Sequence, residues 1–406
     1  MDGRRQTAMT VDPRNAPEQL WAPLNDPAFW AGDPAPHFAR LRREAPVLWN
    51  PAFGYWALAH HADVMTVSRD AATFCSSQGI LATEIGVTYP FPPTTMHTDA
   101  PEHSRYRELV QPGFAPRVMR ALETRVRTRA AAFADRLAAG TAVDFAEAVA
   151  IPFPVAVICD LLGLDHVDDA RVLRWSDAAI PGSSPMTQKE IEAAREDQRA
   201  TLLAATIARR GADGDDLTTA LANAEIDGDR LSDDEILMFQ NQLLVAGNET
   251  TRNMISGGMA ALATRPETWA RLRAEPALVA SAVEEWLRWT TPVISFMRTA
   301  TRATELGGVP IAAGEPVLML YASANRDESV FGPTADEFHV DRTPNPHVAF
   351  GFGPHFCLGA ALARLEGRAL LDELLERFAT VELAGEVVRT ESPAIAGIRA
   401  LPLLLR

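Results

Sequence analysis

One cysteine in a glycine-rich stretch is the residue best placed to do chemistry. The stretch at 350–359 reads FGFGPHFCLG and contains Cys357. Apolar residues recur at helical spacing after Gly359, so backbone N–H groups at a helix start are expected to face the sulfur. Such a position favours the thiolate over the thiol. Glycines on both sides of the cysteine would let the backbone approach a large, flat group.

A core cysteine is the alternative, since free cysteines are among the most buried residues. The complete pattern argues against it: Phe350, Gly353, Cys357 and Gly359 occur together, with His355 two residues before the cysteine. In this pattern the sequence resembles the cytochrome P450 family. The resemblance implies that the Cys357 thiolate is the axial ligand of haem iron. It also implies that Phe350, His355 and Gly359 help to bind the haem b cofactor.

The run AGNETT at 246–251 interrupts an otherwise apolar helical pattern. A glycine inside a helix costs about 1 kcal/mol, and an acid on an apolar face costs more. One interpretation is a kinked helix in which the Thr250 hydroxyl bonds back to the preceding turn. The other is a pocket for dioxygen, where a hydroxyl and an acid deliver protons. The resemblance favours the second: Thr250 binds and protonates oxygen, Glu249 relays protons, and Ala246 and Gly247 lie against the haem.

Glu285 and Arg288 are three residues apart on one predicted helical face. This spacing alone is typical of a surface ion pair. The resemblance instead implies a buried structural triad, completed by Arg342, that supports the cysteine loop. Glu284 competes with Glu285 as the acid, and only the resemblance decides between them.

His103 and Arg107 lie four residues apart at the start of another predicted helix. Solvated basic residues on a capped helix are the simple alternative. The resemblance implies that both bind the haem propionates, together with Arg298 and His355. Arginine suits a carboxylate because its planar donors form a two-bond fork.

These residues need a mainly helical scaffold to position them. Residues 47–49 and 55–58 read as two short strands around a turn, a small hairpin rather than a sheet core. A second β-like stretch covers 305–320, and glycines mark its turns. Helical periodicity and helix-forming residues cover 118–139, 189–210, 232–263 and 276–289. Ser232 and Glu235 match a capping box at the start of the longest helix.

The predicted fold class is mainly α with minor β. The resemblance covers almost the whole chain and implies a single-domain cytochrome P450 fold, a triangular helical prism with small β-sheets. Residues 1–33 are expected to be an N-terminal tail and residues 34–406 the haem domain. No repeat, low-complexity tract or interdomain linker is visible, and the polar run at 211–216 reads as an exposed turn.

Composition agrees with this prediction. The 406 residues are 47% hydrophobic and include three cysteines, too few and too scattered for a disulfide framework or a zinc cluster. This usage suits a reducing cytoplasm. No signal peptide or membrane anchor is visible. A formal charge of -15 argues against general nucleic-acid binding.

The implied activity is oxygen insertion into an unactivated C–H bond, because a thiolate ligand favours O–O cleavage. Electrons are expected to come from a separate protein, since the chain ends soon after the haem loop. The resemblance to soluble bacterial members implies a small iron–sulfur ferredoxin and a NAD(P)H-dependent reductase. Arg364 and Arg368, four residues apart, are candidates for a basic patch that meets an acidic ferredoxin. Solvated side chains are the alternative for both. A monomer is expected.

The substrate is expected to be a hydrophobic small molecule, because the loop at 76–95 is apolar for a connection. The motif wording is similar to actinobacterial members that act on sterol side chains and methyl-branched lipids, while terpenoids, fatty acids and alkanes remain open. Candidate substrate-lining residues are Ile80, Leu81, Ile85, Val87, Tyr89, Phe91, Val293, Ile294, Phe296 and Ile395.

Two other classes of haem protein stay in view. A gas or redox sensor would bind a ligand without turning it over, but it would not need the proton-delivering pair Glu249 and Thr250. A peroxide-driven haem enzyme tends, within this family, to lose that pair. The presence of both residues therefore favours a dioxygen-dependent enzyme.

Overall fold

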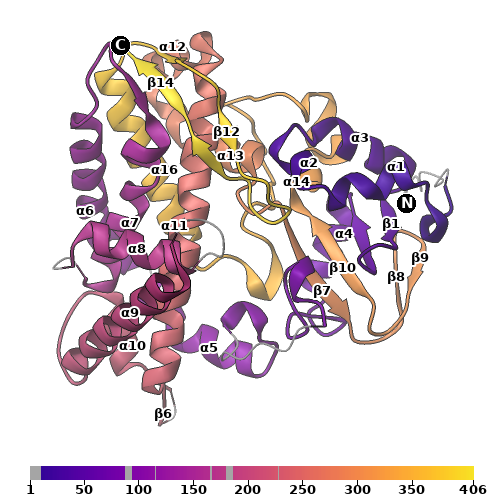
Figure 1. Cartoon of the computed structure of the whole chain (residues 1–406), viewed down its shortest axis with the longest axis horizontal. Helices are drawn as coiled ribbons and strands as arrows, with labels where there is room; N and C mark the ends of the chain where they lie inside the picture. The colour runs from indigo at the N-terminus through magenta and orange to yellow at the C-terminus, as the bar shows by residue number, and fades with distance from the viewer. Residues whose placement is uncertain (1–10, 87–93, 115, 165–166, 180–185, 227) are drawn as a thin grey trace. The chain divides into compact units, whose positions relative to one another are not determined.

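The computed structural model describes residues 11–86, 94–114, 116–164, 167–179, 186–226 and 228–406 (Figure 1). The chain divides into two compact units, and each is described by itself. The first unit contains Met1–Asp99, Glu284–Cys357 and Val388–Arg399. The second contains Ala100–Val283, Leu358–Val387 and Ala400–Arg406. The mainly helical fold with small sheets confirms the predicted fold class.

The second unit is built from helices. They are α5 (Glu102–Val110), α6 (Pro116–Asp135), α7 (Pro152–Leu162), α8 (Asp169–Ala179), α9 (Gln188–Arg209), α10 (Leu217–Asn223), α11 (Asp233–Ala263), α12 (Pro266–Ala274) and α16 (Ala360–Arg377). Three of the four predicted helical ranges correspond to α6, α9 and α11. The fourth corresponds to η7 (Pro276–Leu278) followed by α13 (Val279–Thr290).

Helix α11 begins where the sequence predicts. The Ser232 hydroxyl accepts a hydrogen bond from the Glu235 N–H at 3.2 Å, and the Glu235 carboxylate accepts one from the Ser232 N–H at 2.7 Å. This capping box satisfies two backbone donors that a helix start leaves unpaired. The helix then continues without interruption for 31 residues.

Helix α7 was not predicted, because its sequence is apolar all round and lacks the one-sided pattern of a surface helix. Ten of its eleven residues are buried. It contacts both α6 and α11, while α16 contacts both α6 and α11 from another side. These four helices lie side by side in Figure 1. Burial on every face therefore explains the composition of α7.

A five-stranded sheet organises the first unit, in the order β1-β2-β10-β7-β3. Its strands are β1 (Val47–Asn50), β2 (Tyr55–Leu58), β3 (Phe74–Cys75), β7 (Ser295–Ala300) and β10 (Pro316–Leu320). The predicted strands at 47–49 and 55–58 are confirmed. Their description as a small hairpin apart from the sheet core is wrong, because β2 pairs in parallel with β10, with Ala57 opposite Leu318.

Smaller sheets complete the two units. In the first unit, β8 (Thr304–Leu306) pairs with β9 (Val309–Ile311), which confirms the β-like stretch predicted at 305–320. The remaining sheets consist of β11 (Val381–Leu383) with β14 (Pro402–Leu405) and β4 (Ala142–Asp144), β12 (Val388–Arg389) with β13 (Ile398–Ala400), and β5 (Glu225–Ile226) with β6 (Asp229–Arg230).

The segment before residue 34 contributes to the core of the first unit. Leu20, Leu24 and Trp30 are buried in one apolar cluster with Phe38 and Leu41 of α3 (Ala35–Glu44). Leu20 lies in α1 (Glu18–Trp21), Leu24 in η2 (Ala22–Asn25) and Trp30 in α2 (Pro27–Ala31). The division into residues 1–33 and 34–406 stays a prediction. What the structure adds is that Ala16, Leu20, Leu24 and Trp30 of this segment belong to the core of the first unit.

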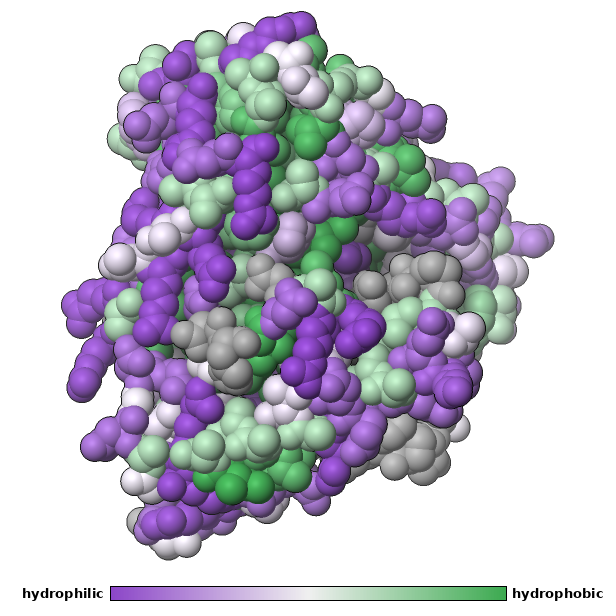
Figure 2. Space-filling model, turned by 60° about the vertical axis from the view of Figure 1, so that its left-hand side comes forward, coloured by the Kyte–Doolittle hydropathy of each residue, from purple (hydrophilic) through white to green (hydrophobic). Residues whose placement is uncertain are grey.

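Polar and charged residues cover most of the face in Figure 2, with apolar residues in smaller groups between them. Within the described ranges, no helix combines the length and apolar character that crossing a bilayer requires.

A buried polar cluster ties α3 to the end of β10 in the first unit. Arg42 is 2% exposed and donates to both carboxylate oxygens of Glu328 and to the Ser323 carbonyl. His60, just before α4 (His61–Arg69), contacts Asp327 at 3.0 Å through Nδ1 and the Arg42 carbonyl at 2.9 Å through Nε2. These contacts join three segments that are far apart in the sequence.

The Asp327 hydrogen bond raises the pKa of His60, with further contributions from the charges of Asp327 and Asp63. A raised folded-state pKa stabilises the fold fully below about pH 6.5, the value for an unfolded histidine, and this stabilisation is lost as the pH rises through the folded-state pKa. We expect the urea midpoint of the wild-type protein to fall between about pH 6 and pH 9, and His60→Gln to flatten this dependence.

The matched control is His339→Gln, which removes an exposed histidine paired with Glu337 and should leave the slope unchanged. An identical slope in the wild-type protein and in His60→Gln would show that His60 does not carry this pH dependence.

Candidate functional site

The cysteine loop lies in the first unit and ends at its boundary. Gly351 and Gly353 have φ values of 67° and 72°, in the left-handed region that favours glycine. A Cβ on Gly353 would lie 2.1 Å from the Ser68 carbonyl oxygen at the end of α4. Gly353 is therefore required for a close approach between two protein backbones, a reason that the sequence alone did not indicate.

Cys357 follows the short helix η9 (Gly353–His355), and its N–H donates to the Phe350 carbonyl at 2.9 Å. Cys357 is exposed. Gly359 is the N-cap of α16, so the predicted helix start after the cysteine is confirmed. The loop thus closes on itself and presents a sulfur that is not packed into the core.

Aromatic and polar contacts fix the loop from both sides. Phe350 and Phe356 pack edge to face at 6.2 Å, and the Arg69 guanidinium lies 4.8 Å from the Phe352 ring. His355 contacts the Ser76 hydroxyl at 3.1 Å through Nε2. Since Ser76 directly follows β3, this contact connects the loop to the edge of the main sheet.

Arg298 lies in β7, one strand away from that contact. Its side chain is buried, which lowers the pKa of its guanidinium, and Nη1 donates to the Met297 carbonyl at 2.6 Å. Among the described residues, no carboxylate lies within ion-pairing distance of this guanidinium. A buried cation without an acid partner is costly unless an anion completes it. Arg298 therefore has the chemistry to accept a carboxylate from a bound group such as a haem propionate.

Glu285 holds the predicted structural triad together in the first unit. Its carboxylate is fully buried and receives two hydrogen bonds from Arg288, at 2.7 and 2.8 Å. Arg342 Nε lies 3.3 Å from the same carboxylate, and Asn345 donates to it at 3.1 Å. Glu284, the competing acid, pairs instead with His347 at 3.1 Å.

The second unit holds His103 and Arg107 on α5. His103 is 5% exposed and Arg107 is half-buried, one helical turn further on. Sequence reasoning missed Arg105 between them, which pairs with Asp229 and, at 2.7 Å, with Glu235 at the start of α11. The available signal was a third basic residue within one helical turn. Its role could not be predicted because its acid partners are distant in the sequence.

The AGNETT run lies inside α11. The Thr250 hydroxyl donates to the Ala246 carbonyl at 2.8 Å, and Glu249 pairs with Arg252 at 2.7 Å; Glu249 and Thr250 are half-buried. A Cβ on Gly247 would lie 3.0 Å from Ile158 of α7, so this glycine also permits close helix packing. The back-bonded hydroxyl matches the first interpretation of Thr250 and leaves its oxygen able to accept a further hydrogen bond.

Sequence reasoning also missed two buried polar side chains in the second unit. The amide of Asn253 is fully buried, with no hydrogen-bond partner for either atom among the described residues. On α16, burial raises the pKa of Glu366 well above its usual value, and one of its carboxylate oxygens has no partner among the described residues. Polar residues inside apolar helical patterns were the available signal.

The described substrate-lining candidates lie in the first unit. Ile80 and Ile294 are buried, while Leu81, Ile85, Val293, Phe296 and Ile395 are half-buried. Ile80 accepts a hydrogen bond from the Met297 N–H at 2.7 Å, and Val293 forms a β-bridge with Ile395. The structure thus joins the Ile80 segment to β7 and the Ile395 segment to the residues just before β7. Val87, Tyr89 and Phe91 lie outside the described residues.

Comparison with known proteins gives these features a family. The sequence model of cytochrome P450 matches residues 185–398, just over half of the chain. Methyl-branched lipid omega-hydroxylase of Mycobacterium tuberculosis is 38% identical over 92% of this chain and 92% of its own. Linalool 8-monooxygenase of Pseudomonas putida is 36% identical over 91% of this chain and 95% of its own.

A solved structure, Mycobacterium marinum cytochrome P450 CYP268A2 in complex with pseudoionone, is 36% identical, with a TM-score of 0.84 over 93% of this chain and 96% of its own. Enzymes of this kind carry haem b ligated by a cysteine thiolate. An unburied cysteine in a closed glycine loop and a buried arginine without an acid partner fit that cofactor. This chain belongs to the cytochrome P450 family of haem monooxygenases.

Proposed function

We propose that this chain hydroxylates a hydrophobic small molecule with dioxygen and two electrons from a ferredoxin. The observation that carries the proposal is the loop at 350–357, which presents Cys357 unburied and closed by its own N–H. When bound, the haem supplies the iron centre at which one oxygen atom of dioxygen enters a C–H bond and the other leaves as water. The residues of the chain are proposed to bind the haem, to orient the substrate and to deliver protons.

Cys357 is proposed to hold the iron, with Phe350 and Gly359 beside it. Arg298 and His355 of the first unit, and His103 and Arg107 of the second, are assigned to the propionates. The buried guanidinium of Arg298 gives the strongest support among these four, because no described carboxylate forms an ion pair with it and only longer-range charges such as that of Asp99 act on it. Glu285, Arg288 and Arg342 are assigned to the support of the cysteine loop.

Thr250 and Glu249 are proposed to deliver protons, with Ala246 and Gly247 next to the haem. The Thr250 hydroxyl donates its hydrogen to the Ala246 carbonyl. Its oxygen can therefore accept a hydrogen bond from a water molecule that supplies a proton. Glu249 is half-buried and held by Arg252, so its carboxylate has a fixed direction. A positioned acid and hydroxyl suit proton transfer in the oxygen-cleaving step.

The proposed substrate is a branched or terpenoid hydrocarbon, a sterol or a fatty acid. Support comes from the apolar candidates Ile80, Leu81, Ile85, Val293, Ile294 and Ile395, and from relatives whose names give linalool and methyl-branched lipids as substrates. An apolar lining selects for shape and hydrophobicity rather than for charge. A monomer in the cytoplasm is the simplest setting.

Replacing the proposed iron ligand is the direct test of the proposal. We expect Cys357→Ser to abolish the red-shifted thiolate band of the reduced carbon monoxide complex, since a hydroxyl does not replace a thiolate as a ligand. Cys159→Ser is the matched control, because Cys159 is buried in α7. A wild-type protein without the thiolate band would contradict the proposal, and a band that survives Cys357→Ser would contradict the assignment of Cys357.

The role of Thr250 is tested by measuring how much product is formed for each NAD(P)H consumed. We expect Thr250→Ala to lower product formed per NAD(P)H by about tenfold or more while NAD(P)H consumption continues, because loss of a positioned proton donor typically costs 10²–10⁴-fold. The substrate is whichever of linalool, testosterone and lauric acid gives the largest spin-state shift in the wild-type enzyme.

Ser256→Ala is the matched control, because Ser256 makes the same back-bond in α11, to the Arg252 carbonyl at 2.7 Å. Tightly coupled turnover in Thr250→Ala would contradict the assignment. Peroxide-driven turnover in the wild-type enzyme that exceeds ferredoxin-driven turnover would favour the peroxide-dependent class, and absence of both would favour a haem sensor.

The ferredoxin interaction is assigned to Arg364 and Arg368, both half-buried on α16. We expect the double change Arg364→Glu and Arg368→Glu to raise the KM for ferredoxin at low salt with little effect on substrate binding, since rim charges act mainly on association. Arg271→Glu on α12, an exposed arginine paired with Glu275, is the control. Unchanged ferredoxin-driven kinetics in the double variant would remove the patch from the proposal.

A further inference from the structure

A buried carboxylate lies in the middle of the loop that carries Ile80 and Leu81. Glu84 ends the short helix η3 (Ala82–Glu84) and is 6% exposed. Its Oε2 atom accepts hydrogen bonds from the N–H groups of Ile80 at 2.8 Å and Leu81 at 3.1 Å. One acid therefore fixes the backbone N–H groups of Ile80 and Leu81, two of the residues predicted to line the substrate.

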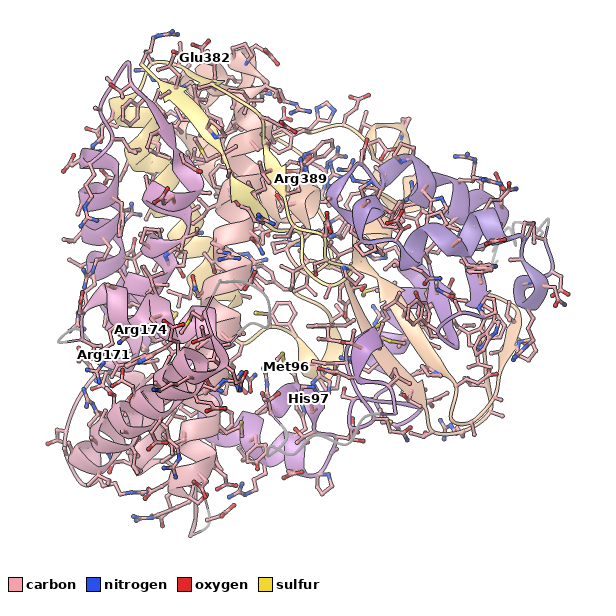
Figure 3. All side chains as sticks on the ribbon, in the orientation of Figure 1. Met96, His97, Arg171, Arg174, Glu382 and Arg389 are labelled. Carbon is pink, nitrogen blue, oxygen red and sulfur yellow. The ribbon has the colours of Figure 1, made fainter. Side chains whose placement is uncertain are left out.

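The same oxygen contacts His97. Nε2 of His97 lies 3.1 Å from Glu84 Oε2, and Nδ1 lies 2.8 Å from the Thr94 hydroxyl. Figure 3 shows Met96 and His97, the last two residues of η4 (Thr95–His97). An ionised carboxylate only accepts, so Nε2 of His97 carries a hydrogen and donates it to Glu84. The Thr94 oxygen in turn accepts from the Met96 N–H at 3.3 Å.

The backbone is shaped around this acid. Gly79 has a φ of 116°, and a Cβ there would lie 3.1 Å from the Glu84 Cβ. Only glycine combines this conformation with such a close approach. Burial alone would raise the pKa of Glu84, but the hydrogen bonds from His97, Ile80 and Leu81 lower it. The carboxylate is thus held ionised by the contacts that fix the loop.

The loop is also anchored to the main sheet. The Ile80 carbonyl accepts from the Met297 N–H of β7 at 2.7 Å, next to Arg298. Glu84 fixes the N–H of Ile80 and β7 fixes its carbonyl, so both sides of this residue are determined. His97 extends the connection to residues 94–97, which precede the segment that leads to α5.

We propose that Glu84 and His97 are positioning residues that fix Ile80 and Leu81 for substrate recognition. The inference rests on the proposed function, because it takes these two apolar side chains as part of the substrate lining. Neither residue is assigned contact with substrate or haem. Their pairing instead determines how tightly, and in which orientation, a hydrophobic molecule is held.

The test uses the haem-loaded enzyme and two azoles that ligate haem iron. Binding of 4-phenylimidazole requires room and apolar contact for its ring, whereas imidazole reports iron access alone. We expect Glu84→Ala and His97→Ala each to weaken the binding of 4-phenylimidazole by about tenfold relative to the binding of imidazole. This is the size of effect expected when buried polar groups lose their hydrogen-bond partners. The readout is the difference spectrum, not turnover.

A conservative variant and a double variant separate positioning from general damage. We expect Glu84→Gln to stay within about threefold of the wild-type protein, since an amide oxygen in the place of Oε2 can accept from the N–H groups of Ile80 and Leu81 and from Nε2–H of His97. The double variant Glu84→Ala with His97→Ala should lose no more than Glu84→Ala alone, because His97 acts on Ile80 and Leu81 through the Glu84 carboxylate. His339→Ala, at an exposed acid and histidine pair, is the matched control.

Equal weakening of both azoles, or an unchanged ratio in both alanine variants, would overturn the inference. If Glu84→Ala does not take up haem, His97→Ala decides, because it leaves the acid and its backbone contacts in place. A wild-type enzyme that lacks the thiolate band contradicts the proposed function itself. A normal band with unchanged azole ratios contradicts only the positioning role.

Discussion

The buried carboxylate of Glu285 is the interaction on which the first unit most depends. One oxygen accepts from Arg288 and from the His339 N–H at 2.8 Å, and the other accepts from Arg288 and Asn345. The remaining Arg288 donors reach the carbonyls of Asn325, Ala335 and Glu337. A buried ion pair with every donor used is stable in place, and removing one partner of such a pair typically costs about 3–5 kcal/mol. The path of the chain toward the cysteine loop follows from this acid.

A series of hydrogen bonds and one close backbone contact connects this region to the cysteine loop. The Val348 N–H donates to the Asn325 side chain at 2.7 Å, and Asn325 donates to Thr291 at 2.9 Å. Gly353 then approaches the Ser68 carbonyl more closely than any other residue type would permit. Cys357 is therefore positioned by Thr291 just after α13, by Asn325 at the end of α14 (Tyr321–Ala324) and by α4, not by its own loop alone. This explains how a sulfur can be both exposed and well placed.

Local pattern was enough to find the elements but not their partners. The capping box of α11 and the strand at 55–58 could be predicted because each depends on residues that are close together in the sequence. The parallel pairing of β2 with β10 could not, since it joins segments about 260 residues apart. The choice between Glu284 and Glu285 also needed the fold, because adjacent acids differ only in what surrounds them. Glu84 was missed for the same reason: a loop acid looks solvated until His97 and Gly79 are seen against it.

The buried arginines of the first unit separate structural charge from charge kept for a ligand. Arg42 and Arg288 meet Glu328 and Glu285 at 2.9 and 2.7 Å, and Arg326, whose pKa burial lowers to about 10, has Asp336 at 3.4 Å. Arg298 is as buried as these, yet the described protein offers it no carboxylate within reach. The charge of Asp99 acts on Arg298 from a longer distance, but a fold that pairs Arg42, Arg288 and Arg326 directly with a carboxylate has no structural need to leave this one without such a pair. The exception lies one strand from the Ser76 and His355 contact, and its position supports the assignment of Arg298 to a carboxylate that the cofactor brings.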